Sequence, residues 1–258
     1  MFQKKRKLKF KERHCLDKMD YKVKRELRRL NSKQVEEDIK RYLKSPYEFY
    51  GIRIPELKTM GKKFHDSHSL KEFYPIFNNL WKSNYHDKMS LAIYSLQLYK
   101  EEFDLTTWKF IKNKLKDMKT IDIIDNVGIN IIGEILLKYP YIKREILKMS
   151  KSKNPLIRRL AIVSTLTLIN KKETDLSFKL AESYLNDKSL YVQKATGWIL
   201  NECSKKKQEK TKKFILKNKL NPVIFNYATE KMKELRKLKK IKKLKKDKKG
   251  IISWLKNN

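Results

Sequence analysis

The sequence has few of the residues that make turns. It contains six Gly and six Pro among 258 residues, whereas an antiparallel sandwich or barrel needs a turn signal roughly every 8–12 residues. This scarcity favours helices, and no segment shows the alternating apolar and polar residues of a half-buried strand. We predict an all-α protein.

Cysteine and long apolar runs are also scarce. Two cysteines, Cys15 and Cys203, do not suggest a disulfide framework, which favours a reducing compartment inside the cell. No run without a charged residue exceeds 11 residues, far short of the roughly 20 that a membrane-spanning helix needs. The basic N-terminus lacks the apolar centre of a secretory signal. We therefore expect no membrane partner and an intracellular protein, cytoplasmic and nucleoid-associated in a prokaryote or nuclear in a eukaryote.

Acidic residues are outnumbered more than twofold. The chain has 29 Asp and Glu against 64 Lys and Arg, a net charge of +35. Residues 1–13 hold 7 basic and 1 acidic side chains and residues 231–249 hold 12 and 2, which still leaves +19 on the rest of the chain. Such an excess indicates a polyanionic partner, most plausibly nucleic acid, with an anionic membrane surface as the weaker alternative. Lysine-rich codon usage is the alternative source of the charge.

Helix start signals recur along the chain. Ser69 and Glu72 have the spacing of a capping box, in which each side chain accepts a backbone N–H of the other residue. The pairs at 154–155 and 221–222 are both Asn-Pro, which suits an N-cap followed by the first helical position. Between these signals the apolar residues follow the helical period.

The predicted helices are evenly spaced. Strong helices are expected to start near Tyr85, Thr120, Pro155 and Leu190, each 35 residues after the last. A second helix fits into each interval, at 105–117, 140–150, 174–186 and 208–218. A helix pair repeated in this way is typical of HEAT-like α-solenoids. The fold class that we predict is a HEAT-like α–α superhelix with a concave basic DNA-binding face.

The basic termini are set apart from this array. We expect a repeat domain over residues 20–235, a basic N-terminal arm at 1–19 and a basic C-terminal helix or tail at 236–258. The C-terminal segment has Leu and Ile spaced three residues apart among lysines. It packs on the last repeat, lies along phosphates, or is simply a solvated helix.

The segment TIDIIDNVG, residues 120–128, places Asp122 and Asp125 in an apolar run. In the 35-residue register Asp125 is the sixth residue of its unit, Arg159 the fifth and Trp198 the ninth, so the three side chains are expected on one face. They form either a functional site or two structural features, an inter-repeat Asp125–Arg159 salt bridge and a core tryptophan. Asp122 points about 60° away from Asp125 and is expected to cap or pair locally.

Four segments resemble, in order, the blocks of one protein family. They are RYLKSPYEFYGIRIPEL (41–57), TIDIIDNVG (120–128), NPLIRRLAIVSTL (154–166) and VQKATGWILNECSK (192–205). The family is that of the AlkD-like DNA alkylation repair enzymes, alkylpurine DNA glycosylases, and the similarity runs from about residue 20 to residue 235. It implies a HEAT-like solenoid that binds duplex DNA in a basic concave groove and releases cationic bases such as N3-methyladenine and N7-methylguanine.

The resemblance also assigns roles to residues. It implies that Asp125 is the essential carboxylate, that Arg159 contacts DNA, that Trp198 is a cleft aromatic and that Tyr42 borders the lesion site. It further implies a monofunctional hydrolase of base excision repair that needs no cofactor. We expect a monomer. We also expect no metal, because the four histidines are scattered without acid or cysteine partners at ligand spacing.

Two positions depart from the family pattern. Ile121 stands where the family usually has Trp, four residues before Asp125, and Asn201 stands where it has a basic residue. Losing one cation–π partner, at roughly 0.5–2 kcal/mol, slows a reaction about 2- to 30-fold. Two alternatives to the glycosylase therefore stay open. One is a weakly active or inactive paralogue that binds duplex or distorted DNA, and the other is a helical-repeat scaffold for protein interactions.

Overall fold

The computed structural model describes residues 2–43 and 45–237, with the side chains of residues 14, 16–43 and 45–237. Regular structure in this part of the chain is helical apart from one isolated bridge between Glu48 and Tyr85. The all-α prediction is confirmed for these residues. Most of the predicted C-terminal helix or tail, residues 238–258, lies outside the described residues.

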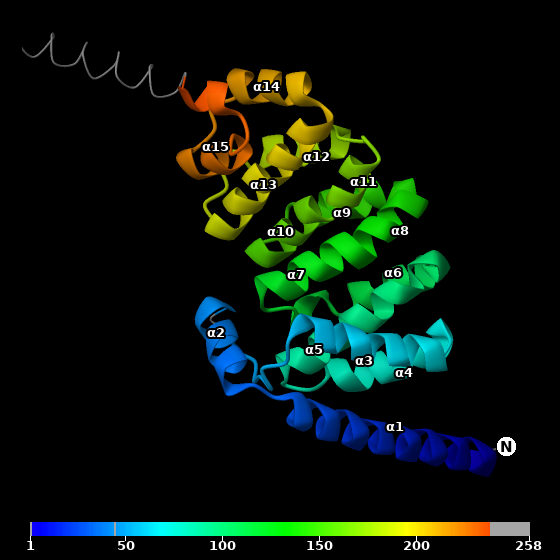
Figure 1. Cartoon of the computed structure of the whole chain (residues 1–258). Coiled ribbons are helices and arrows are strands. Elements are labelled where there is room, and N and C mark those ends of the chain that lie inside the picture. The colour runs from blue at the N-terminus through cyan, green and yellow to red at the C-terminus, as the bar shows by residue number, and fades with distance from the viewer. Residues whose placement is uncertain (1, 44, 238–258) are drawn as a thin grey trace, which may run out of the picture. The chain divides into compact units, whose positions relative to one another are not determined.

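The chain divides into two compact units, the first ending at Ile142 and the second starting at Lys143. The first unit contains α1 (Phe2–Leu30), α2 (Lys33–Leu43), α3 (Ile54–Ser67), α4 (Leu70–Trp81), α5 (His86–Leu96), η1 (Gln97–Glu102), α6 (Leu105–Lys112), η2 (Leu115–Asp117), α7 (Ile121–Val127), η3 (Gly128–Ile132), α8 (Gly133–Lys138) and η4 (Pro140–Ile142) (Figure 1). The second contains α9 (Lys143–Met149), α10 (Pro155–Val163), α11 (Leu166–Asn170), α12 (Asp175–Ser183), α13 (Leu190–Lys206), α14 (Gln208–Lys217) and α15 (Pro222–Ala228).

The predicted helix starts agree with the structure. Helices α5, α7, α10 and α13 begin within one residue of the four predicted positions. The capping box forms at α4, where Ser69 N donates to Glu72 Oε2 at 2.9 Å and Glu72 N to Ser69 Oγ at 3.4 Å. The predicted intervening helices correspond to α6 with η2, η4 with α9, α12 and α14. Local capping signals thus fix where most helices begin.

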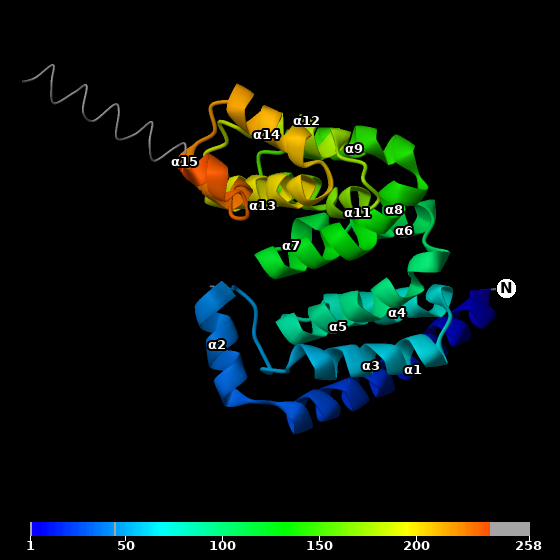
Figure 2. The ribbon, with the colours of Figure 1, turned by 45° about the horizontal axis from the view of Figure 1, so that its top comes forward.

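In the first unit, α5 packs against α3 and α4 (Figure 2). Its core-facing residues are fully buried, among them Leu91, Ile93 and Leu96. Helix α1 contacts α4, and the buried ammonium group of Lys88 on α5 binds Asp20 of α1. The segment 1–19, expected as an arm, belongs to α1 from Phe2 onward.

The loop before α3 is held in place through its backbone N–H groups. Asp87 is buried at the start of α5 and accepts hydrogen bonds from Tyr50 N at 2.7 Å and Ile52 N at 2.9 Å. Between them Gly51 has φ +72°, and a Cβ there would lie 2.3 Å from Ser32 O. Only glycine suits this conformation and this close approach. The loop therefore fixes where α3 begins.

In the second unit, α13 is the central helix and packs against α10, α11, α12, α14 and α15. Val192, Ala195, Ile199 and Leu200 on α13 are fully buried. The crossing with α15 is close at Gly197, where a Cβ would lie 2.5 Å from Tyr227 Cβ. The glycine of the QKATGW segment is thus required by helix packing.

Candidate functional site

An open pocket of about 660 Å³ lies in the first unit, among α3, α5, η1, α7, η3 and α8. Its wall includes Asp125, the predicted carboxylate, together with Asp122. Other side chains that line it belong to Ile54, Lys58, Tyr94, Lys100, Asn126 and Asn130. The pocket therefore combines carboxylates, amides and the cationic side chains of two lysines.

The sequence of α7 separates an apolar face from a polar one. Ile123, Ile124 and Val127 are buried, while Asp122, Asp125 and Asn126 are only partly covered. Because burial of the isoleucines and the valine anchors one side of the helix, the acids on the opposite side face the pocket. The apolar run that surrounds the two acids in the sequence thus anchors the helix that carries them.

Asp122 pairs with a histidine from α5. His86 Nε2 lies 2.6 Å from Asp122 Oδ2, and His86 Nδ1 lies 3.4 Å from Ser90 Oγ. The His86 ring is buried and stacks on Phe49 at 4.9 Å between centroids. Burial by itself would raise the pKa of Asp122, but the hydrogen bond and charge of His86 outweigh it and lower that pKa. Asp122 does pair, as expected, and its partner His86 is 36 positions away; hydrogen bonds from the nearby Thr120 side chain and Ile123 backbone also lower its pKa.

A second polar connection joins the same two helices. Tyr94 on α5 is hydrogen-bonded to the side chain of Asn126, and burial raises the pKa of the Tyr94 phenol despite this bond. Asn130 Nδ2 donates to Asn126 Oδ1 at 2.7 Å, and Lys58 Nζ lies 5.7 Å from the centroid of the Tyr94 ring. Asn130 belongs to η3, a π-helical turn, and such turns occur frequently at functional sites.

The two connections lie on either side of Asp125 along α7. The first, His86–Asp122, is three residues before it, and the second, Tyr94–Asn126, is one residue after it. The two connections therefore fix α7 against α5, both in its rotation about its own axis and in its position along that axis. This arrangement can hold the Asp125 carboxylate in one place at the pocket wall, as catalysis by a positioned charge requires.

The remaining predicted residues of the first unit lie at helix ends. Ile121 is the first residue of α7 and is partly exposed. Tyr42 lies near the end of α2 with 77% of its surface exposed. Both side chains are therefore open to a partner.

The second unit holds Arg159, Trp198 and Asn201. Arg159 on α10 is 8% exposed, and its Nη1 donates to Tyr191 O on α13 at 2.8 Å. Trp198 on α13 is half-buried, so it is not a fully buried core aromatic. Asn201, one turn later, is buried with its Nδ2 3.5 Å from Glu230 Oε2. The structure thus brings Arg159 to the helix that carries Trp198 and Asn201.

His86, Tyr94 and Asn126 were not foreseen as site residues. The sequence did contain a signal for His86 as a partner of Asp122. His86 is the second residue of its 35-residue unit, and Asp122 is the third residue of the next unit. Near-equivalent positions in consecutive repeats are the ones that meet when repeats stack. Tyr94 and Asn126 gave no such signal, since their meeting depends on the spacing between α5 and α7.

Comparison with known proteins gives the family. The model of the family described as DNA alkylation repair enzyme matches residues 23–232. The chain belongs to this family. The resemblance noted in the sequence is thereby confirmed.

A solved structure described as a "predicted DNA alkylation repair enzyme from Enterococcus faecalis" has a similar fold. It matches with a TM-score of 0.71 over 79% of this chain and 97% of its own, at 18% sequence identity. No curated protein matches the chain significantly. The likeness at this identity concerns the fold alone.

The described residues contain neither a metal-binding cluster nor a membrane-spanning helix. Among them, no group of three or more His, Cys, Asp or Glu side chains could hold a metal ion. Nor is any helix in the same part of the chain long and apolar enough to span a bilayer.

Proposed function

We propose that this member of the DNA alkylation repair family is a monofunctional DNA glycosylase. It hydrolyses the N-glycosidic bond of cationic alkylpurines, N3-methyladenine and N7-methylguanine, in duplex DNA. The observation that carries this proposal is Asp125, a carboxylate at the wall of an open pocket, on a helix that is bonded to α5 both before and after this residue. The excess of basic side chains supplies the attraction for DNA.

The chemistry explains why a carboxylate suits a DNA-binding protein. An N3- or N7-alkylated purine already carries a positive charge, so it takes the electron pair of the breaking bond and leaves neutral without prior protonation. Positive charge then develops on the deoxyribose as an oxocarbenium ion. Asp125 stabilises this cation, orients the water that bonds to C1′ and accepts the proton that the water loses.

The other residues serve binding in this proposal. The helix pairs form a HEAT-like solenoid whose concave basic face receives the duplex. Tyr42 and Trp198 keep aromatic surface exposed for the lesion and its cation. Arg159 contacts DNA in the family pattern, and here its hydrogen bond to Tyr191 O gives it a second task, since it also holds the start of α13.

The test is release of 7-methylguanine and 3-methyladenine from methylated duplex DNA at matched salt. Wild type should release both bases, and Asp125→Asn should lose at least about 100-fold in rate, as expected when an electrostatic group of the transition state is removed. Asp38→Asn, an exposed acid on α2, is the control and should act like wild type. Equal background rates from all three proteins would exclude the glycosylase.

A second candidate function is DNA binding without base release. Ile121 in place of the usual Trp favours it, and so does Asn201, which is buried where the family has a basic residue. This candidate predicts affinity for duplex or distorted DNA, no released base and no effect of Asp125→Asn. A protein-interaction scaffold, by contrast, predicts weak DNA binding that is insensitive to Arg159 and Trp198.

A further inference from the structure

A groove of about 610 Å³ lies between α1 and α3 in the first unit. Helix α1 packs against α4 and α3 packs against α5, which leaves the space between α1 and α3 open (Figure 2). Ile54 and Lys58, in the first turns of α3, line the pocket of Asp125, whereas the second half of α3 and its C-cap, residues 60–68, line the groove. The groove is therefore a second surface, with no lining residue in common with the candidate site.

The floor of the groove is apolar and comes from both helices. Met19 and Val23 are four residues apart on α1, and Met60 and Phe64 are four residues apart on α3. Residues with this spacing lie on one face of a helix, so each helix presents a pair of apolar side chains to the groove. Val23 and Met60 are buried, while Met19 and Phe64 are partly exposed. The flexible methionine side chains can adapt to the shape of a bound partner.

The rim of the groove is basic. Lys18 and Lys22 on α1 and Lys63 on α3 line it and are exposed. Glu26 is the acid among the lining residues, and Arg29 Nε and Nη2 donate to its carboxylate at 3.1 and 2.7 Å. The hydrogen bond from Arg29 lowers the pKa of Glu26, and the charge of Lys63 adds to this effect. The three lysines thus outnumber an acid that already has a partner.

An apolar floor between basic rims selects an amphipathic anion. The lining residues span positions 18–26 on α1, which is roughly 12 Å of helix. A bound helix places side chains i, i+4 and i+7 on one face within that length. Apolar side chains at these positions can fill the floor, and acidic ones beside them can meet the lysines.

Two other anions fit the groove less well. Duplex DNA presents phosphates on its outer surface, which would pair with the lysines but leave the apolar floor unfilled. A fatty acid would fill the floor but carries one carboxylate at one end, whereas Lys22 and Lys63 stand on opposite walls. A helix can carry acids along both sides of its apolar face, so it matches the floor and both walls.

We propose that the groove is the docking site for an acidic amphipathic helix of a partner protein. The apolar side chains of that helix pack between the Met19–Val23 and Met60–Phe64 pairs, and its carboxylates pair with the three lysines of the rim. This inference goes beyond the proposed glycosylase and does not depend on it, because the groove and the candidate site share no lining residue.

The experiment measures the affinity of the full chain for two labelled peptides by fluorescence anisotropy. Both contain the same leucines, glutamates and alanines. In the first peptide the leucines stand at i, i+4 and i+7 and share one helix face, and in the second they are dispersed around the helix. Because the two peptides have equal charge, the general attraction of a chain of net charge +35 is the same for both. The one-faced peptide should bind about tenfold or more tightly, since it alone can bury its leucines together.

Matched variants locate the binding site. Lys63→Glu reverses a charge at the rim, and Lys62→Glu makes the same change at the adjacent exposed lysine, which does not line the groove. Lys63→Glu should bind the one-faced peptide at least about threefold more weakly than Lys62→Glu, because it places like charges together. Met19→Ala should weaken binding about fivefold. Met149→Ala, at a partly exposed methionine of α9, should not.

The same four variants are titrated with dodecanoate and with an undamaged duplex. Equal affinity for the two peptides, or equal effects of test and control variants, would overturn the inference. Dodecanoate binding that is lost in Met19→Ala, with no peptide bound, would make an acyl anion the occupant and overturn it too. So would duplex binding that Lys63→Glu weakens more than Lys62→Glu while peptide binding does not change.

The assay of base release is read separately. Met19→Ala and Lys63→Glu should release 7-methylguanine as their controls do, because neither residue lines the pocket of Asp125. Peptide binding with the expected variant effects supports the docking site even if wild type releases no base. Base release without any preference between the peptides supports the glycosylase and overturns the docking site.

Discussion

At the scale of single residues, the pocket places two carboxylates one helical turn apart in different surroundings. Asp122 is hydrogen-bonded to the buried ring of His86, and Asp125 lies on the pocket wall one residue before the Tyr94–Asn126 connection. Environments that differ in this way give neighbouring acids different roles. Asp122 orients the helix, and Asp125 is the group proposed to act on DNA.

The lowered pKa of Asp122 leads to a prediction for acid unfolding. A carboxyl group whose pKa is lower in the folded state stabilises that state above its unfolded pKa of about 3.9, and the contribution is lost as the pH falls through the folded value. Asp122→Asn should therefore be less stable than wild type at pH 6, and the difference should shrink below about pH 4.

The measurement is urea unfolding followed by circular dichroism at several pH values. Asp38→Asn serves as the control because Asp38 is exposed and its contacts, a hydrogen bond from Gln34 Nε2 at 3.2 Å and a long contact with Arg41 at 3.9 Å, lie within its own helix. It should match wild type throughout. An Asp122→Asn deficit that is the same at pH 3 and pH 6 would mean that the carboxylate's charge is not what stabilises the fold.

Ile121 provides a gain-of-function prediction. Ile121→Trp restores an aromatic face at the start of α7, four residues from Asp125, and should raise the rate of base release about 2- to 30-fold through cation–π attraction. Ile54→Trp, at the exposed start of α3 on the pocket wall, is the matched control. Single-turnover rates on 7-methylguanine DNA give the comparison. An Ile121→Trp rate no higher than that of the control would show that the missing indole is not what limits this chain.

At the scale of helices, the sequence predicted which helices form and where they start. It did not predict as well which helices contact each other. Asn154 and Asn221 cap α10 and α15, where each side chain accepts a backbone N–H at 2.9 Å, because a cap is decided by neighbours in the sequence. The π-helical turn η3 and the His86–Asp122 pair were not predicted. The pair depends on how α5 and α7 pack, which local propensity does not specify.

The helix scale also gives a prediction about packing at Gly197. A Cβ there would lie 2.5 Å from Tyr227 Cβ and 2.7 Å from Ile224 O, which forces α13 and α15 apart. Gly197→Ala should lower the free energy of unfolding by roughly 1–3 kcal/mol, the usual cost of overpacking. Gly61→Ala is the control, since its nearest contact, Ser95 N, lies at 3.2 Å, and it should cost less. Urea unfolding compares the two, and equal losses would contradict the close approach.

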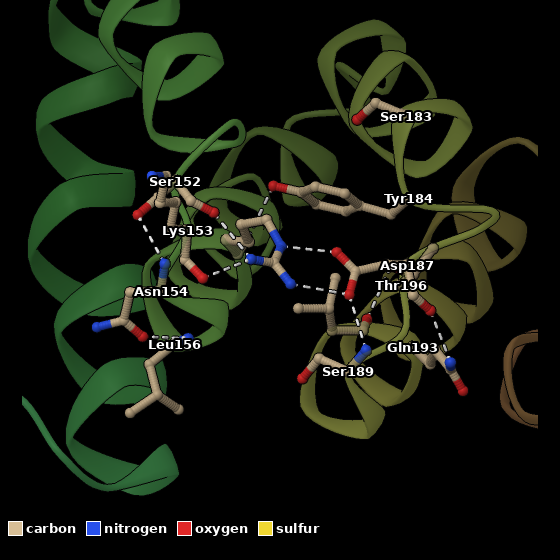
Figure 3. Close-up of polar contacts among 12 residues, drawn as sticks. Ser152, Lys153, Asn154, Leu156, Ser183, Tyr184, Asp187, Ser189, Gln193 and Thr196 are labelled. Atoms are coloured by element: carbon tan, nitrogen blue, oxygen red, sulfur yellow. Dashed lines mark hydrogen bonds and ion pairs between the residues drawn. The ribbon is translucent and has the colours of Figure 1, made fainter.

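At the scale of the whole molecule, the all-α class and the family followed from the sequence. The 35-residue spacing and the segment order depend on residues that are visible without coordinates. The ion pair between Arg158 and Asp187 did not follow from them, because these two residues are 29 positions apart (Figure 3). A pair of arginines in the sequence indicates charge, but only the packing of α10 beside α13 shows that one of them binds a buried acid.

The opposition of charges is the central feature of the molecule. A chain of net charge +35 attracts DNA, yet it places a carboxylate at the pocket where a cation is proposed to form. A catalyst of this kind binds the transition state more tightly than the substrate. The carboxylate should therefore distinguish a cationic sugar from a neutral one of the same shape.

The most direct measurement compares two duplexes, one with a cationic pyrrolidine abasic analogue and one with neutral tetrahydrofuran. Wild type should bind the cationic duplex more tightly, by about tenfold or more, and Asp125→Asn should bind both equally while keeping wild-type affinity for the neutral one. A preference that survives in Asp125→Asn, or no preference in wild type, would contradict the role assigned to this carboxylate.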